Sequence, residues 1–320
     1  MPPPPCPDTV ARRSVPGQAA PPFPITLPAT MDLIYRFDPL APTAERECPD
    51  ADAALERILS GNRRFCDVVE QIRQRSADGD ARQPIVVPMC PLSLGVPGRE
   101  NLPPGQAPFA LVVGCSDARV PIETVLGQSL NELFVVRIAG NVLGVECLAS
   151  VDFAASHFRD SLKLAVALGH TQCGAVSAAV DAYLSPGRYT RIAFTPSLRT
   201  LVDHLQMVVR GAATALREVY GRSVEHHPRY REALAEVAVY LNAAFTAHDL
   251  GREMHLSGDA PVRVVYTVYD LLTHRLHAFP DGAPHEAAAA AFAEAPREGE
   301  GFVALGRRIA QGATAATAAV

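Results

Sequence analysis

Two cysteines and one histidine of this sequence follow short apolar runs. Cys115 comes directly after FALVVG at 109–114, and His170 follows LKLAVALG at 162–169, with Cys173 three residues further on. Runs of this kind indicate strands of a parallel sheet that is buried on both faces. Ligand sites in such sheets form beyond the carboxyl ends of the strands. We therefore expect Cys115, His170 and Cys173 to converge at one edge of the sheet.

Two thiolates and one imidazole are a ligand set that suits zinc. Three protein ligands leave a fourth position for water, as catalytic zinc sites do. Cys173 also precedes Gly174 at an expected helix start, where the helix dipole lowers the pKa of a thiol and favours the thiolate. The alternative is that both thiols are inert core groups and that His170 caps a helix, because cysteine often packs as a small apolar residue.

The other five cysteines are expected not to bind the metal. Cys66 and Cys147 fall on predicted helices, where packing is the ordinary role of a thiol. The remaining three are Cys6, Cys48 and Cys90. The chain has an odd number of cysteines and enough apolar residues for a core, so no disulfide framework is expected.

Asp117 and Arg119 lie on the loop that is expected to leave the strand before Cys115. A carboxylate beside zinc can accept a hydrogen bond from water, and an arginine can hold that carboxylate ionised and oriented. We predict that these two residues form a catalytic pair. The alternative is a surface ion pair that contributes less than about 1 kcal/mol to stability. A cysteine-dependent phosphatase loop is excluded, because it needs its arginine further from the cysteine.

The segments between these residues predict the fold. Apolar runs at 109–114, 133–140 and 162–169 are separated by helix-like segments, and this alternation is typical of a parallel sheet with helices on both faces. A later run, VRVVYTVYDL at 262–271, turns into RLHAF, which predicts a hairpin at the sheet edge. The expected fold class is α/β, with a central, mostly parallel β-sheet flanked by helices and an antiparallel edge strand.

Apolar residues at helical spacing predict three long helices. One covers residues 55–72, and the second begins at Thr195 and Pro196, which suit the N-cap and the first helical position. The third runs over about 228–250, and Gly251 is placed to end it.

Composition divides the chain into four parts. Ten of the 28 prolines fall in the first 28 residues, so 1–30 is expected to be a disordered arm, or alternatively a Pro-rich docking segment. Residues 31–50 are an N-terminal extension, 51–282 the domain with the metal site, and 283–320 an Ala-rich tail in which FVALGRRIAQ favours a peripheral helix. The Pro- and Gly-rich stretch at 74–107 is either a surface wrap or a binding loop.

Charge and hydropathy exclude other classes of function. The chain has 29 Lys and Arg against 34 Asp and Glu, a net charge of −5. Neither nucleic acid nor a membrane surface is an expected partner, because such binding needs clustered cationic charge. No run approaches about 18 consecutive apolar residues, and no apolar targeting segment follows the N-terminus. A cytoplasmic location is the expectation.

Two segments resemble the zinc-binding regions of the β-class carbonic anhydrases. They are GCSDARVPIETVLGQSLNELFVVRIAGNV at 114–142 and LGHTQCGAV at 168–176. In addition, ALERILSGNRRF at 54–65 resembles the N-terminal helix of that family, and VVYTVYDLLTHRLH at 264–277 is similar to its last hairpin. The resemblance covers about 54–280 and is most specific in the two zinc motifs.

This resemblance implies reversible hydration of CO2 to bicarbonate and a proton, with zinc on the three ligands named above and the Asp117–Arg119 pair beside it. Gln106 matches a glutamine that contacts substrate in the subgroup with an open zinc site, and Phe134 matches an apolar wall residue. Phe153 stands where the family often has tyrosine. The resemblance also implies a homodimer or a higher homo-oligomer with active sites at subunit interfaces.

The chain has no Trp, and the subgroup whose aspartate binds zinc uses Trp in a regulatory bicarbonate pocket. The open subgroup is therefore favoured. Two other functions stay open. One is hydrolysis of COS or CS2 at the same zinc site, because the chemistry of attack is identical. The other is a catalytically idle zinc-binding scaffold or bicarbonate sensor. The presence of Asp117, Arg119 and Gln106 argues against it, because a structural zinc site has no use for an open coordination position.

Overall fold

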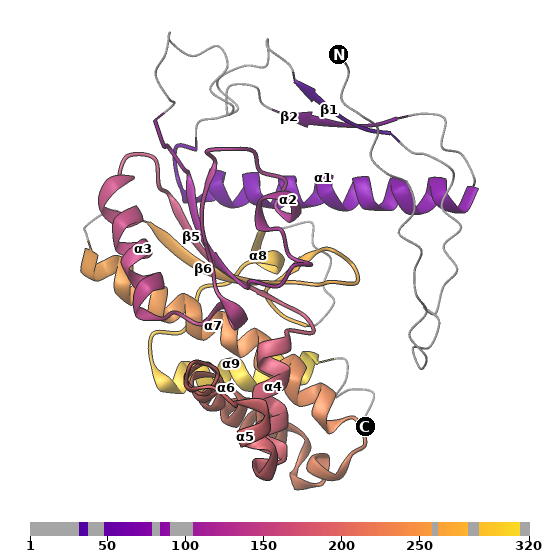
Figure 1. The fold of residues 1–320 in the computed structure, drawn as a ribbon, viewed down its shortest axis with the longest axis vertical. Helices are drawn as coiled ribbons and strands as arrows, with labels where there is room; N and C mark the ends of the chain where they lie inside the picture. Colours follow the sequence, from indigo (N-terminus) through magenta and orange to yellow (C-terminus); the bar gives the residue numbers. More distant parts are fainter. Residues whose placement is uncertain are drawn as a thin grey trace.

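A five-stranded sheet lies at the centre of the protein, which we describe from a computed structural model (Figure 1). Its strands follow the order β4-β3-β5-β6-β7, and their bounds in that order are Leu133–Arg137, Ala110–Gly114, Leu164–His170, Arg263–Tyr269 and Leu276–His277. The first four strands are parallel, and β7 pairs antiparallel with β6 at the edge. The predicted α/β fold, with a mostly parallel sheet and an antiparallel edge strand, is confirmed.

The structure describes most of the chain, namely residues 32–37, 48–78, 84–89, 105–257, 262–280 and 288–313. The expected disordered arm at 1–30 lies outside the described residues, as do Cys6 and Cys90.

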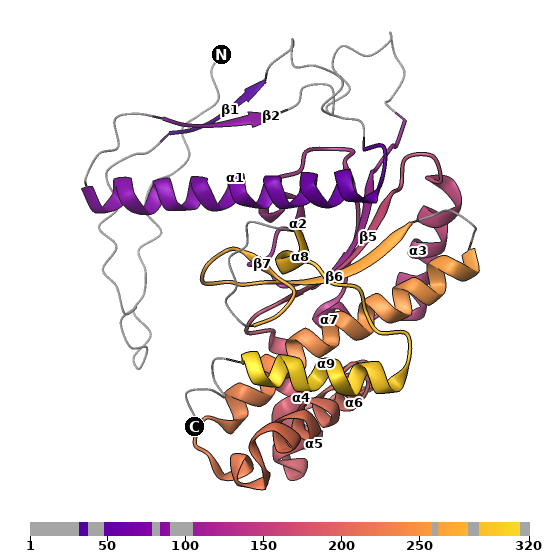
Figure 2. The same ribbon diagram turned by 180° about the vertical axis from the view of Figure 1, so that it is seen from behind.

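Helices cover both faces of this sheet (Figures 1 and 2). On one face lie α1 (Ala51–Asp78) and the short helices α2 (Ile122–Val125) and α8 (Ala288–Ala291). On the other face lie α3 (Val145–His157) and α7 (Tyr230–Ser257). The long first helix that the apolar spacing predicts is therefore present as α1.

Alternate residues of the central strands point to opposite faces, so both sides of each strand must be apolar. Val112 of β3 packs in the same cluster as Ile58 of α1, whereas Leu111 and Val113 pack with Val151 of α3. All five residues of β3 and all seven of β5 are buried. This burial explains why both strands read as continuous apolar runs in the sequence.

A further layer of helices packs on the side of α7 that faces away from the sheet. It consists of α4 (Gly174–Leu184), α6 (Pro196–Tyr220) and α9 (Gly299–Gly312), the last of which contains the segment that favours a peripheral helix. The Thr195 hydroxyl accepts a hydrogen bond from the Leu198 N–H at 3.2 Å, so the predicted start of α6 is confirmed. The other short helices are α5 (Tyr189–Ile192) and 3-10 turns at Ala139–Asn141, Pro186–Arg188 and Arg222–His226.

The predicted end of the third long helix is wrong. Helix α7 continues through Gly251 to Ser257, and Gly251 is not among the glycines with positive φ. A glycine ends a helix when it adopts the left-handed conformation, which Gly251 does not. The helix continues because its next turn still packs on the core, where Met254 is 7% exposed.

The stretch at 74–107 contains a strand that the sequence did not predict. Its apolar residues form β2 (Ile85–Met89), which pairs in parallel with β1 (Leu33–Phe37) in a separate two-stranded sheet. The partner strand lies about 50 residues earlier in the chain, and no local pattern shows such a pairing.

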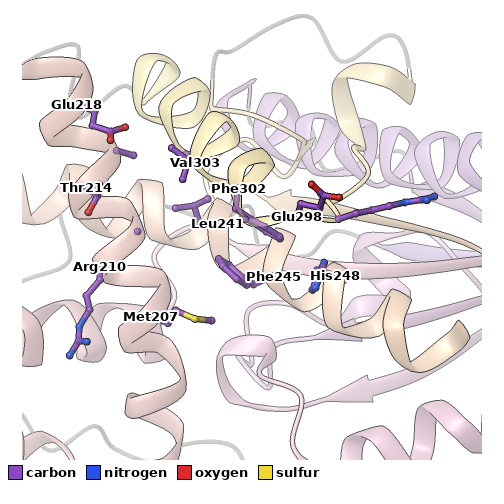
Figure 3. A pocket seen from close by; sticks show the side chains of 15 residues that line it. Met207, Arg210, Thr214, Glu218, Leu241, Phe245, His248, Glu298, Phe302 and Val303 are labelled. Atoms are coloured by element: carbon purple, nitrogen blue, oxygen red, sulfur yellow. The ribbon is translucent and has the colours of Figure 1, made fainter. Parts of the chain in front are cut away.

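An apolar groove of about 580 Å³ opens between α6, α7 and α9 (Figure 3). Phe245 of α7 and Phe302 of α9 stack at its centre, with ring centroids 4.2 Å apart. None of the predicted site residues lines this groove.

Among the described residues, no helix has the length and hydropathy needed to cross a bilayer.

Candidate metal centre

The three predicted zinc ligands lie together at the carboxyl ends of two neighbouring strands. Cys115 follows the last residue of β3, His170 is the last residue of β5, and Cys173 is the N-cap residue of α4. Their ligand atoms all lie within 4.8 Å of one another, and all three residues are buried. Because β3 and β5 are paired in register by the ladder, this juxtaposition follows directly from the sheet.

His170 presents one free ring nitrogen to the two thiols. Its Nδ1 lies 2.9 Å from the carbonyl oxygen of Thr171 and donates a hydrogen bond to it. That bond leaves Nε2 with its lone pair, and Nε2 is buried with no hydrogen-bond partner. A buried polar atom without a partner is costly, and a metal ion on Nε2 would satisfy it. The residues present therefore fit a zinc ion.

The two thiols are set in different surroundings. A hydrogen bond with Cys173 lowers the pKa of Cys115, and the Gly140 N–H, which donates to the Cys115 sulfur at 3.3 Å, acts in the same direction. The same pairing raises the pKa of Cys173, as does its burial, while the N–H groups of Val176 and Ala175 at the start of α4 oppose that rise. The site thus favours one thiolate before any metal binds, and a cation would favour both.

Asp117 and Arg119 form a close pair beside the predicted metal ligands. The Asp117 carboxylate accepts hydrogen bonds from the Arg119 backbone N–H at 2.9 Å, from Nε at 3.0 Å and from Nη2 at 2.8 Å. These bonds hold the pKa of Asp117 well below its usual range. Its Oδ2 lies 3.8 Å from His170 Nε2, so the ionised carboxylate faces the proposed metal position.

Arg137 fixes the loop that carries these residues, and it is not among the site residues predicted from the sequence. Its Nε donates to the carbonyl oxygen of Cys115 at 3.2 Å, and its Nη2 donates to that of Asp117 at 2.8 Å. Arg137 is the last residue of β4. The strand-end argument that identified Cys115 and His170 would also have found it.

Gln106 and Phe134 do not reach this group within one chain. Gln106 precedes β3 whereas Cys115 follows it, and a strand of five residues separates its two ends by roughly 17 Å. Phe134 pairs with Leu111, near the start of β3, at the same far end of the sheet. There it stacks against Phe153 with ring centroids 6.3 Å apart. These two residues stay a prediction.

The other described cysteines lie outside the metal group. Cys147 lies on the buried face of α3 in the core cluster, and the Cys66 thiol donates to the carbonyl oxygen of His274 at 3.2 Å. Cys48 lies beside Arg57. Among the described residues, no second set of three or more potential ligands gathers in this way.

The comparisons with known proteins identify relatives of this chain. Residues 110–275 match the family described as carbonic anhydrase. Carbonic anhydrase 2 of Mycobacterium tuberculosis is 41% identical over 102 residues, which is 31% of this chain and 48% of that protein. The carbonic anhydrase of Mycolicibacterium smegmatis is 41% identical over 105 residues, 33% of this chain and 50% of that protein. The chain thus matches about half the length of these curated relatives.

Solved structures give a similar but weaker likeness. A β-carbonic anhydrase of the fungal pathogen Aspergillus fumigatus is similar over 66% of this chain and 85% of its own, with 23% identity and a TM-score of 0.42. The family match and the two mycobacterial relatives are the stronger findings.

Proposed function

The chain belongs to the carbonic anhydrase family, and on this premise we propose that it catalyses the zinc-dependent, reversible hydration of CO2 to bicarbonate and a proton. One observation carries the proposal. The ligand atoms of Cys115, His170 and Cys173 lie within 4.8 Å of one another, with the Asp117 carboxylate 3.8 Å from His170 Nε2. Three protein ligands beside an ionised carboxylate suit a catalytic zinc site, whereas a structural site takes four.

Each ligand has a partner that prepares it to hold zinc. Zinc in this site would supply Lewis-acid activation of water near neutral pH. The carbonyl oxygen of Thr171 fixes the ring of His170 with Nε2 free. The Gly140 N–H supports the charge on Cys115, and the N-terminus of α4 supports the charge on Cys173.

In this proposal Asp117 accepts the hydrogen bond of the reacting water. Arg119 keeps the carboxylate ionised: Oδ1 accepts two of its hydrogen bonds, whereas Oδ2 accepts one and keeps a second lone pair available. Arg137 holds the backbone of Cys115 and Asp117, so ligand and carboxylate keep a fixed spacing. The relatives reported above are named carbonic anhydrases, which favours CO2 over COS or CS2 as the substrate.

We also propose that two or more copies of the chain assemble. Gln106 and Phe134 lie at the far end of β3 from the metal ligands, so they could contact substrate only at the site of another copy. Phe153, which stacks on Phe134, is 45% exposed in the single chain. An exposed phenylalanine that stacks on a second aromatic ring is a candidate interface residue, because aromatic side chains are enriched at interfaces.

The remaining proposals concern the extent and the location of the enzyme. We propose that residues 51–282 form the catalytic domain and that α9 covers one side of it, because Ile309 of α9 packs in the same core as α6 and α7. A cytoplasmic location suits a site that needs two free thiolates, since the cytosol keeps thiols reduced.

The test is a stopped-flow assay of CO2 hydration on protein of measured zinc content, at pH 7 and pH 8.5. We expect one zinc per chain and hydration well above the buffer background, with faster turnover of CO2 than of COS. Zinc-loaded protein that hydrates no CO2 at either pH would overturn the proposed activity. Faster turnover of COS or CS2 than of CO2 would change the assigned substrate and leave the assignment of the zinc site unchanged.

Matched cysteine variants locate the metal in the same experiment. Cys115→Ser removes a proposed ligand and should lose both zinc and activity. Cys147→Ser alters a thiol that is also buried, at 8% exposure, but lies outside the metal group. The Cys147→Ser variant should keep both its zinc and its activity. Equal zinc content in the two variants would count against the ligand assignment.

A further inference from the structure

The turn at Ala139–Asn141 contacts the metal group through one backbone hydrogen bond. The Gly140 N–H donates to the Cys115 sulfur at 3.3 Å. Gly140 has φ of +65°, and a Cβ on it would meet the Cβ of Ala175 at 3.0 Å, so glycine is favoured on both grounds. The N–H can point at the sulfur only while the turn keeps this unusual conformation.

Two side chains of α7 hold that turn in place. The Asn242 amide donates to the carbonyl oxygen of Gly140 at 2.7 Å. The Thr246 hydroxyl donates to the carbonyl oxygen of Asn141 at 3.0 Å and accepts from the Asn141 side-chain amide, also at 3.0 Å. Asn242 and Thr246 are four residues apart, and therefore share one face of the helix.

These groups lie in the interior, where lost hydrogen bonds are most costly. Asn242 is 4% exposed, Thr246 5% and Asn141 2%. Asn141 also has a positive φ, of 47°, so two consecutive residues of the turn sit in the left-handed region. Such a conformation persists only where its surroundings hold it, and here the surroundings are the two α7 side chains.

We infer that Asn242 and Thr246 are positioning residues for the metal centre. They fix the turn, the turn aims the Gly140 N–H at Cys115, and this hydrogen bond keeps the thiolate oriented towards the metal. Loss of either side chain should therefore speed the release of zinc. The inference rests on the proposed zinc site, and it concerns how firmly that site holds its metal.

Thr246→Val is the sharpest test, because it keeps the shape of the side chain and removes both hydrogen bonds. The measurements are the rate of zinc release from the loaded protein to a chelator, and the thiolate-to-metal absorption band of the cobalt-substituted protein. Groups that orient metal ligands contribute about 10- to 100-fold to metal affinity, so we expect zinc release at least about tenfold faster and a shifted cobalt band. Thr246→Ser keeps the hydroxyl and should release zinc almost as slowly as the natural chain.

Thr267→Val is the matched control. Thr267 is fully buried on β6, and its hydroxyl has no hydrogen-bond partner among the described residues. Its loss should leave zinc release unchanged. Thermal unfolding of each metal-free variant shows whether it is folded, and Asn242→Ser provides a second, independent break in the turn's support.

The outcomes separate this inference from the proposed function. If the natural chain holds zinc and the folded Thr246→Val and Asn242→Ser variants release it at the same rate as the natural chain, the inference is overturned and the zinc site stands. If the natural chain binds no zinc, the proposed function fails first and the inference fails with it. Faster release from Thr267→Val as well would show a general effect of core stability and would also overturn the inference.

Discussion

At the scale of single residues, the protonation state of Asp117 is set by its neighbours. Three hydrogen bonds from Arg119 hold the pKa of this carboxyl below its usual range. A lowered folded-state pKa means that the ionised form stabilises the folded chain above the ordinary pKa, and that this contribution is lost as the pH falls towards the folded value. Asp117 therefore stays ionised throughout the neutral range. A change of activity near neutral pH must come from the titration of another group.

Asp117→Asn should reduce CO2 hydration by about 10²- to 10⁴-fold, the range for loss of a positioned proton acceptor. Asparagine keeps the size of the side chain but not the charge, so zinc content should stay near that of the natural chain. Stopped-flow rates and metal analysis on the same sample check both statements. Asp181→Asn is the control. Asp181 lies on α4, and its carboxylate likewise accepts two side-chain hydrogen bonds from an arginine, from Nε of Arg231 at 2.6 Å and from Nη2 at 3.0 Å. Full activity in Asp117→Asn would contradict the assigned role.

Sequence reasoning found some site residues and missed others for physical reasons. Cys115 and His170 could be predicted because each lies at the carboxyl end of a buried strand, and Arg137 could have been found on the same ground. Asn242 and Thr246 give no such signal. They lie within a long helix about 100 residues beyond the turn they hold, and only the packed structure brings them to it.

At the scale of elements, prediction succeeded where one local pattern decides the structure. The strands β3 and β5 are buried on both faces, so their sequences are apolar without interruption. The end of α7 depends instead on what the helix packs against. Gly251 resembles a stop signal, but the last turns of α7 still have a core to cover, and Met254 lies in it. Tertiary packing overrides the local signal there.

Gly251→Ala should stabilise the protein by about 0.5–1 kcal/mol, because a glycine within a helix loses more backbone freedom on folding than alanine does. A Cβ at this position has room, with the nearest side-chain atoms, those of Val264, at 4.0 Å. Chemical denaturation of the two proteins measures the difference in the free energy of unfolding. Gly61→Ala, in helix α1, is the contrasting variant, because its Cβ would overlap the carbonyl oxygen of Leu126. It should destabilise by about 1–3 kcal/mol. A loss of stability in Gly251→Ala would contradict this account of α7.

At the scale of the whole molecule, the proposed site is divided between the two ends of the sheet. The proposed metal ligands lie at the carboxyl ends of β3 and β5, whereas Gln106 and Phe134 lie near the start of β3. A single chain cannot bring the two sets together. The sequence could indicate both sets of residues, but their separation depends on the direction of each strand in the finished sheet.

Co-expression of two inactive variants tests this division. Gln106→Ala and Asp117→Asn should each have low activity alone. In a mixed dimer, one of the two sites would combine the natural Asp117 of one chain with the natural Gln106 of the other. The second site would carry both mutations. Random pairing of equal amounts makes half of the dimers mixed, so activity should return to roughly a quarter of the natural level. Activity that stays at the level of the separate variants would place Gln106 outside the partner's site.

The proposed metal ligands are attached to the central strands of the sheet and to a packed helix. Cys115 directly follows β3 and His170 ends β5, two strands that are paired residue by residue in the middle of the sheet, and Cys173 is the N-cap residue of a helix packed against the core. Their relative positions are therefore established by the folding of the sheet itself. A zinc finger, by contrast, acquires its structure from the ion. We therefore expect this chain to reach its native architecture first and to take up its metal afterwards, so that metal supply would govern how much of the folded protein is active and not how much of it folds.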